Sequence, residues 1–408
     1  MRFLVLFLVL SLVTGAATAE VEIVRNGSTP ANGVQVLNLQ EMWRAGGADD
    51  EENFFGLITW AEEGPGGVIY VLDVQLCQVN VFDSDGQLLR TLFHEGEGPG
   101  EIRQPRDLVL LEDGSLGAVQ EFPGKIVRVD DQNNPLPSIE PRLGDAADGG
   151  FVAMITAEQR GGTFLMSGVQ IRPGENQAQQ QRHMYLARVN EQGKVSQPLL
   201  ERFVDWDFSN FVYDEDVDLP SFYWSNALGP DGRIYAAPER SAYRINVYNP
   251  EGVLERVIER DFNPRKRTAE DKAWIRAMLD GALRQLPMPY ELKICDTDSD
   301  LSWLNRSLQV DAQGYLWVLS SRGVREQPDG VLATFDVFSP HGQYDHQVQV
   351  ACEGDGKEDG VFLLGQDRVL VIKGYVDAIA TMFGGAVPED EDSEEAAPME
   401  IVCYRITS

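Results

Sequence analysis

The order of apolar and polar residues predicts short β-strands along most of the chain. Residues 68–106 give the clearest set, with three apolar runs: 68–72, the run around Val79 and Val81, and 88–93. Between the second and third runs, Gly86 can adopt a positive φ and the neighbouring Asp side chains can bond the local backbone, so the pattern predicts a hairpin. Residues 96–100 (GEGPG) follow with no helix or strand pattern, and we interpret them as a crossing into the next unit.

The same unit recurs along the chain. Residues 226–258 repeat it most clearly, residues 307–350 form a third copy, and weaker copies start at Arg106, after Phe151 and near residue 360. A turn glycine precedes the second strand of five copies, with Gln366 in the sixth place: Gly67, Gly114, Gly162, Gly232 and Gly314. The intervals of 47, 48, 70, 82 and 52 residues indicate a period near 47 with insertions. Four short strands at this period are typical of a β-propeller.

We therefore predict an all-β fold: a six-bladed β-propeller of four-stranded antiparallel blades, with one short helical insertion. Residues 20–408 are expected to form a single domain, with approximate blades at 53–98, 106–140, 151–203, 222–262, 303–350 and 358–407. The third blade carries an insertion. The last blade lacks a strand, and the apolar run at 34–39 is expected to complete it, because an open ring would leave an exposed sheet edge.

The predicted helix covers residues 268–285. Thr268 is a suitable N-cap, and Asp271 takes the capping-box position, where Glu or Gln is usual. The apolar stripe of this helix is expected to pack on the propeller, with a lid over a pocket as the alternative. Residues 388–398 are a run of acids with no apolar content and are expected to be a disordered loop.

Residues 1–19 have the features of a secretory signal peptide. Arg2 supplies the positive start, residues 3–13 are apolar, and residues 17–19 (Ala-Thr-Ala) form a small-residue cleavage site. The apolar run is too short to span a bilayer, and no later stretch is long and apolar enough to do so. We therefore expect an exported protein without a membrane span, in the periplasm or outside the cell.

The chain is strongly acidic. Its formal net charge is −31, and removal of the leader takes away only Arg2, which leaves −32. Nucleic acids and anionic membrane surfaces are therefore poor partners. A solvated acidic surface explains the excess of acids, and a cation-binding face is the alternative.

Four cysteines permit three disulfide pairings, and the sequence alone does not choose among them. Cys77 and Cys403 lie in strand-like runs, where a buried free thiol is common. Cys295 and Cys352 lie in polar, loop-like segments, so a bridge between them is the pairing that we favour in an exported protein. None of the spacings resembles a zinc site.

The repeats resemble a known group. PDGRIYA…YRINVYNPEGVLERVI, within residues 230–258, is similar to the NHL-type blade, and GEGPGEIRQPRDLVLLEDG, residues 96–114, is similar to the blade junction of exported bacterial six-bladed β-propellers. The resemblance covers most of the mature chain and extends to the wider TolB-like superfamily. That superfamily includes protein-binding propellers and also calcium-dependent lactonases, so the resemblance implies the fold more strongly than the function.

Candidate site residues stand where each predicted inner strand begins, because these ends would converge on the mouth of the central channel. Blade packing or surface exposure is the alternative role for each of them. They are Arg106, Asp107, Trp224, Asn226, Trp303, Asn305 and Arg306. The four histidines fit no nucleophile or metal motif, and no G-x-S-x-G sequence occurs, so no catalytic residue is identified.

The resemblance to calcium-dependent lactonases implies one candidate cofactor. Those propellers hold Ca²⁺ with Glu, Asn and Asp side chains at the channel, and Asn226 stands where such an Asn would be, with Asn305 as a second candidate. Oxygen ligands of this kind suit Ca²⁺. No partner set of Glu and Asp is evident in the sequence.

Three functions remain open from the sequence. The leading interpretation is a monomeric, non-enzymatic binding propeller for a protein, peptide or glycan, since no catalytic set is evident. The second is a metal-dependent hydrolase or lactonase of the same fold, and the third is a structural scaffold of the cell envelope. Acidic side chains around a cation in the channel would favour the second, and a channel filled by side chains would favour the first.

Overall fold

The computed structural model describes residues 20–407 except 49, 51–52, 145–149, 304–305, 366 and 385–397. The predicted leader, Gln366, Asn305 and nearly all of the acidic run at 388–398 lie outside the described residues. Within the described part, no helix is long and apolar enough to cross a membrane.

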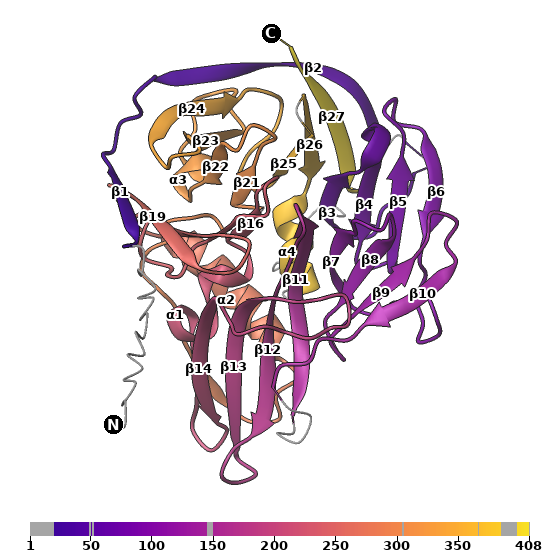
Figure 1. The fold of residues 1–408 in the computed structure, drawn as a ribbon, viewed down its shortest axis with the longest axis vertical. Coiled ribbons are helices and arrows are strands. Elements are labelled where there is room, and N and C mark those ends of the chain that lie inside the picture. Colours follow the sequence, from indigo (N-terminus) through magenta and orange to yellow (C-terminus); the bar gives the residue numbers. More distant parts are fainter. Residues whose placement is uncertain are drawn as a thin grey trace, which may run out of the picture.

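Small antiparallel sheets make up most of the fold, and they surround a common centre like the blades of a propeller (Figure 1). Three of them have four strands, each following the chain order. The first contains β3 (Ile58–Glu63), β4 (Ile69–Asp73), β5 (Gln78–Phe82) and β6 (Leu88–Leu92). The second contains β7 (Pro105–Leu110), β8 (Leu116–Gln120), β9 (Lys125–Val129) and β10 (Pro135–Ile139). The third contains β11 (Phe151–Arg160), β12 (Thr163–Pro173), β13 (Gln179–Arg188) and β14 (Leu200–Asp207).

Two of the remaining sheets are extended by the N-terminal segment. A five-stranded sheet contains β16 (Asn226–Leu228), β17 (Ile234–Ala236), β18 (Arg244–Tyr248), β19 (Leu254–Arg260) and the parallel β1 (Glu22–Asn26). An eight-stranded sheet joins β21 (Leu308–Val310), β22 (Leu316–Leu319), β23 (Ala333–Phe338) and β24 (Tyr344–Val350) through β2 (Val34–Gly46) to β27 (Glu400–Thr407), β26 (Arg368–Lys373) and β25 (Gly360–Leu364). Two short strands, β15 (Phe211–Asp214) and β20 (Tyr290–Lys293), pair by themselves.

These sheets differ from the six separate four-stranded blades that the sequence predicts. The difference comes from β2, whose residues 34–37 pair in parallel with β24 and whose residues 38–46 pair antiparallel with β27. One strand therefore hydrogen-bonds to two groups of strands and makes them a single sheet. The predicted closing strand at 34–39 was too short, because the residues after it include Gly46 and Gly47 and do not have the pattern of a strand.

Trp43 ties the same segment to a third sheet. Its indole Nε1 donates a hydrogen bond to the Ser84 carbonyl (3.1 Å), and its ring stacks on Phe82 with centroids 5.7 Å apart. Gly86 in the β5–β6 turn has φ 82°, and a Cβ there would lie 2.4 Å from the Trp43 ring. The turn thus requires glycine both for its backbone and for this contact.

The turn glycines have the positive φ that the predicted turns require. Gly67, Gly114, Gly162, Gly232 and Gly314 all have positive φ, between 76° and 85°. The residues predicted as an insertion in the third blade lengthen a hairpin, since β12 and β13 stay paired from Leu165 and Arg188 to Pro173 and Gln180. Residues 175–181 are polar and Gln-rich, so the sequence lacks the apolar pattern that would predict these strands.

The prediction of one helical insertion was incomplete. Helix α2 (Ala269–Leu283) begins after Thr268 with the predicted capping box to Asp271, and its apolar face packs on Trp206, Phe211 and Tyr213. Three further helices were not predicted: α1 (Glu215–Asp218), α3 (Arg322–Arg325) and α4 (Tyr375–Met382). Helix α4 lies near the centre of the ring (Figure 1) and contacts β3. Its run of mostly apolar residues is too short for periodicity to separate a helix from a strand.

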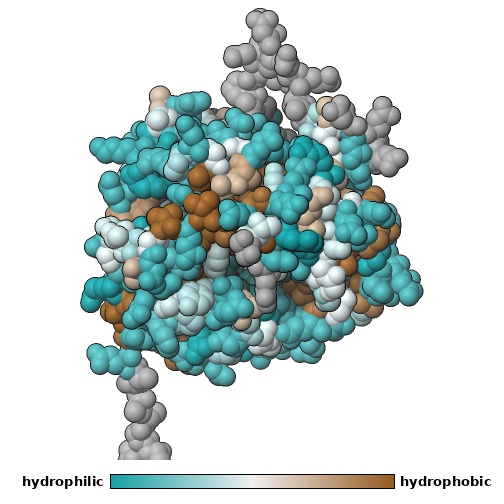
Figure 2. All heavy atoms as spheres, turned by 90° about the horizontal axis from the view of Figure 1, so that it is seen from above, coloured by the Kyte–Doolittle hydropathy of each residue, from teal (hydrophilic) through white to brown (hydrophobic). Residues whose placement is uncertain are grey.

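The surface is mainly polar, in keeping with the acidic composition. Figure 2 shows one face that is largely hydrophilic, with hydrophobic residues in small separate groups. Several acidic side chains are instead buried or enclosed around the centre of the ring, and they define the site described next.

Candidate functional site

The inner strands place their first residues at one end of the channel. β3, β7 and β11 are neighbours, and each carries a one-residue β-bulge, which lies near the start of β3 and of β7 and in the middle of β11. The extra residues are Thr59, Arg106 and Ile155, and all three line one narrow cavity. Because a bulge re-aims a side chain, these three irregularities together shape one wall of that cavity.

This narrow cavity has a volume of about 90 Å³. Four of the predicted channel-mouth residues line it: Arg106, Asp107, Trp224 and Trp303. Arg106 Nε donates a hydrogen bond to Glu121 (2.5 Å), and its guanidinium lies 5.0 Å from the Phe383 ring centroid. The structure therefore brings these sequence-predicted residues together beneath α4, whose Ile379 and Met382 close the cavity.

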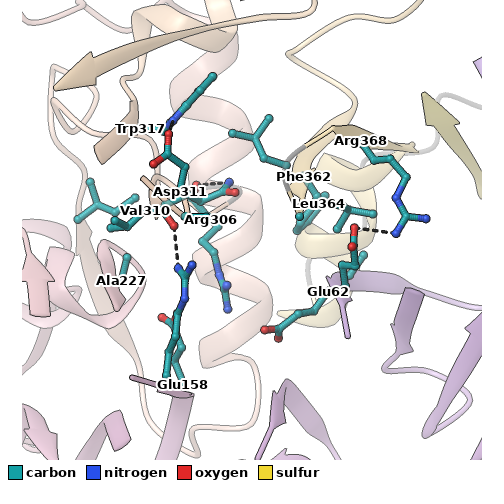
Figure 3. A pocket seen from close by; sticks show the side chains of 18 of the residues that line it. Glu62, Glu158, Ala227, Arg306, Val310, Asp311, Trp317, Phe362, Leu364 and Arg368 are labelled. Atoms are coloured by element: carbon teal, nitrogen blue, oxygen red, sulfur yellow. Dashed lines mark hydrogen bonds and ion pairs between the residues drawn. The ribbon is translucent and has the colours of Figure 1, made fainter. Parts of the chain in front are cut away.

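The later residues of the inner strands meet at the other end, around a wide cavity of about 550 Å³ (Figure 3). Most of its charged groups already have partners. Arg368 Nη2 pairs with Glu63 (2.7 Å), and Arg160 Nη1 donates to the carbonyls of Leu228 (3.1 Å) and Val310 (2.7 Å). Figure 3 shows Glu62 and Arg306 reaching into the space between these two groups.

Arg306 lies between the two cavities. A small space lined by Trp60, Asp107, Glu158, Asn226 and Arg306 shares residues with both of them. The guanidinium of Arg306 lies 4.2 Å from the Trp60 ring centroid, a cation–π distance. Side chains therefore fill the middle of the channel and leave a separate cavity at each end.

Three carboxyl groups surround Arg306. Burial raises the pKa of Glu62 to about 7, and Glu158 adds to this rise while Arg306 and Arg160 oppose it. Burial likewise raises the pKa of Asp107 to about 8 against the opposing charge of Arg306, and it raises the pKa of Glu158. Burial alone would lower the pKa of Arg306, but the charges of the three carboxylates outweigh it and raise that pKa. Arg306 is thus the cation that all three buried acids share.

Two of these carboxyl groups also connect neighbouring sheets. Asp107 on β7 accepts a hydrogen bond from the Ala157 N–H on β11 (3.0 Å). Glu158 on β11 accepts one from the Leu228 N–H on β16 (3.2 Å). The same acids that hold Arg306 therefore fix the spacing of three inner strands.

The predicted calcium ligands have other contacts or lie outside the described residues. The Asn226 amide donates to the carbonyls of Phe222 (3.0 Å) and Tyr223 (3.2 Å), which fixes the turn before β16. Asn305 is not described. Among the described residues, no group of three or more His, Cys, Asp or Glu side chains is placed to hold a metal ion. The three buried carboxyl groups at the channel instead lie around the guanidinium of Arg306.

The predicted disulfide is wrong. All four cysteines are free thiols, and Cys295 and Cys352 lie in different surroundings. The backbone N–H of Cys295 donates to Glu215 (2.9 Å), whereas Cys352 packs with the β23–β27 cluster near Lys373. Loop-like sequence context placed both residues near the surface but gave no information on their distance.

Four site residues were missed in the sequence: Thr59, Trp60, Glu62 and Glu158. Thr59 and Trp60 occupy in β3 the bulge region that Arg106 and Asp107 occupy in β7, so aligning the first strand with the later copies would have found them. Glu62 and Glu158 could have been found as carboxyl groups within strands predicted to line the centre.

No protein-family model matches this chain, and no curated protein matches it. Several solved structures are similar to it at low identity. A candidate exported protein from Bacteroides fragilis has 10% identity and a TM-score of 0.46, with coverage of 95% of this chain and 100% of that one. Regucalcin, a calcium-binding protein from Agrobacterium tumefaciens, has 11% identity and a TM-score of 0.42, covering 92% and 97%. Virginiamycin B lyase from Staphylococcus aureus has 10% identity and a TM-score of 0.41, covering 91% and 100%. At this similarity none of them carries an argument about this chain.

Proposed function

We propose that this protein is an exported, monomeric, six-bladed β-propeller of the NHL-like type that binds a ligand at one end of its channel. In this interpretation β2 completes the last blade with residues 38–46, and the eight-stranded sheet counts as two blades. The other blades are β3–β6, β7–β10, β11–β14 and β16–β19. The arrangement of inner strands around a shared centre supports this count (Figure 1).

One observation carries the binding proposal: Glu62 faces a cavity of about 550 Å³ and forms no ion pair of its own among the described residues, although Glu158, Arg160 and Arg306 line the same cavity. The volume lies within the usual range of ligand sites. A cationic group from a ligand would stabilise the ionised form of Glu62, which burial disfavours. The ligand that we propose is therefore a peptide, bound through an ammonium group of its N-terminus or of a lysine side chain.

The pH dependence of peptide binding tests this proposal. An ammonium group needs ionised Glu62, so trilysine is expected to bind more tightly as pH rises from 6 to 8, through the pKa of Glu62 near 7. Glu62→Gln is expected to weaken binding by roughly 10- to 100-fold, the range for a hydrogen bond to a charged group, and to remove the pH dependence. Calorimetry measures both effects.

Two controls make the result specific. Glu255→Gln changes an exposed acid that pairs with Arg233, so it should leave trilysine affinity unchanged. Trilysine acetylated on its four amino groups should not bind. Equal affinity for the acetylated and free peptides would contradict the proposal.

A hydrolase is the second candidate function, and the pKa of Glu62 supports it. A carboxyl group that titrates near 7 suits a general base. The calcium-dependent form of this alternative fits the described residues less well, because Arg306 already lies among the carboxyl groups and would repel a divalent ion.

Added calcium is therefore expected to leave thermal stability unchanged. Protein stripped with a chelator and then given millimolar Ca²⁺ should unfold at the same temperature, as measured by differential scanning calorimetry. A bound ion stabilises the folded state in proportion to the logarithm of its concentration. A midpoint that climbs with Ca²⁺ and not with Mg²⁺ would instead favour the calcium-dependent hydrolase.

A further inference from the structure

The narrow cavity beneath α4 is a second site that the proposed function does not use. Trp60 and Arg306 separate it from the wide cavity, since the small space between them shares residues with each. Its walls come from the bulges of β3, β7 and β11, from Trp224 and Trp303, and from α4. None of the residues that line it also lines the wide cavity, so a ligand here would not contact the groups assigned to the peptide site.

Two of the buried polar groups in this cavity that have no hydrogen-bond partner among the described residues lie on neighbouring bulges. One is the Thr59 hydroxyl, on a residue that is only 3% exposed. The other is Arg106 Nη1, on a guanidinium whose Nε is bound to Glu121. Both residues occupy bulge positions on adjacent strands and line the same space. Leaving such groups unpaired is unfavourable, so an acceptor oxygen placed between them would be bound by both.

The charges around the cavity favour a neutral ligand. Arg106 and Glu121 form an ion pair and cancel one another. Asp107 is 1% exposed, and its pKa of about 8 keeps it largely protonated at pH 7. An anion would therefore meet Glu121 without an uncompensated cation, and a cation would find no free carboxylate.

The size and walls of the cavity limit the ligand further. Trp224 and Trp303 lie with ring centroids 6.0 Å apart, and Ile379, Met382 and Phe383 add apolar surface. An apolar cavity of about 150 Å³ holds benzene, so one of about 90 Å³ holds roughly four non-hydrogen atoms. We propose that this cavity binds a small neutral molecule with one carbonyl or amide oxygen, which accepts from Thr59 and Arg106, and a short apolar body against the tryptophans.

Four probes of equal size test the proposal in the intact protein: acetamide, acetone, acetate and isopropylammonium. Acetamide and acetone are expected to bind with millimolar affinity, near the limit for so few atoms, and at least tenfold more tightly than acetate or isopropylammonium. Tryptophan fluorescence and saturation-transfer NMR measure this binding. Acetate or isopropylammonium binding as tightly as acetamide would overturn the charge argument.

A matched pair of threonine variants tests the role of the hydroxyl. Thr59→Val keeps the side-chain shape, so it is expected to weaken acetamide at least tenfold while the free protein stays as resistant to urea as the wild type, because no hydrogen bond is lost. Thr163 is 1% exposed but donates to the Gly232 carbonyl (2.8 Å). Thr163→Val should therefore lower the urea midpoint and leave acetamide affinity unchanged. Unchanged acetamide binding in Thr59→Val, or a loss of stability equal to that of Thr163→Val, would overturn the proposal. Neither result depends on whether the wide cavity binds a peptide.

Discussion

Replacing Arg306 by leucine is expected to destabilise the protein by about 3–5 kcal/mol at pH 8, the usual cost of removing one partner from a buried group of charges. The guanidinium is the cation that Glu62, Asp107 and Glu158 share, and it also stacks on Trp60. Without it, the three carboxyl groups would lie together at the centre of the ring with only Arg160 to oppose them. Urea unfolding followed by circular dichroism gives the change in the free energy of unfolding.

The loss of stability in Arg306→Leu should increase with pH. Glu62 and Asp107 have folded-state pKa values of about 7 and 8, above those of unfolded Glu and Asp. A carboxyl group of this kind binds its proton more tightly when folded, so its contribution to stability falls as pH rises from about 4 to the folded pKa. Removing Arg306 raises both pKa values further. The deficit of Arg306→Leu relative to the wild type should therefore be smaller at pH 5.5 than at pH 8.5.

Two variants serve as controls for this experiment. Arg233 is 43% exposed and pairs with Asp231 and Glu255, so Arg233→Leu should cost about 1 kcal/mol or less. Adding Asp107→Asn to Arg306→Leu removes one of the uncompensated acids and should restore part of the lost stability. A deficit that is equal at both pH values would show that the three carboxyl groups do not depend on Arg306.

Local signals in the sequence were enough to predict much of the strand content. In five of the units, the turn before the second strand contains a glycine with positive φ. This preference is local to four or five residues, so the period of Gly67 and its counterparts could be found without tertiary contacts. Helix α4 and the full length of β2 could not be predicted from local sequence, because both depend on partners that are distant in the chain. Residues 38–46 become a strand when β27, more than 350 residues later, pairs with them.

The candidate site shows the same division. Arg106, Asp107, Trp224 and Trp303 were predicted together because equivalent ends of repeated strands meet at one end of a ring. The role of Arg306 was only partly predicted, since the sequence placed it at the channel but not among three acids. Glu62 and Glu158 come from different strands, and their shared environment arises only when the ring brings β3 and β11 to one centre. The spacing of residues within one strand therefore does not predict that these two carboxyl groups share an environment.

A chain that begins at Asn53, without β1 and β2, is expected to lose the folded state or to remain folded only with a far lower free energy of unfolding. The missing segment pairs with β19, β24 and β27 and packs Trp43 on the β5–β6 hairpin. Its removal would expose β27 as an open edge and separate the two halves of the eight-stranded sheet. Exposed edges promote association between chains. Size-exclusion chromatography should therefore show aggregates in place of a monomer.

Single substitutions in the same segment give a graded version of the test. Trp43 is 9% exposed, so Trp43→Ala should cost about 3–5 kcal/mol, as for other large aromatic side chains removed from a core. Val36 lies on the same strand but is 53% exposed, and Val36→Thr should change stability by about 0.5 kcal/mol or less. Urea unfolding compares the two variants with the wild type. If the chain from Asn53 were monomeric and as stable as the full chain, β2 would be an accessory to the ring, and the two parts of the eight-stranded sheet would have to be held together by their inner strands alone.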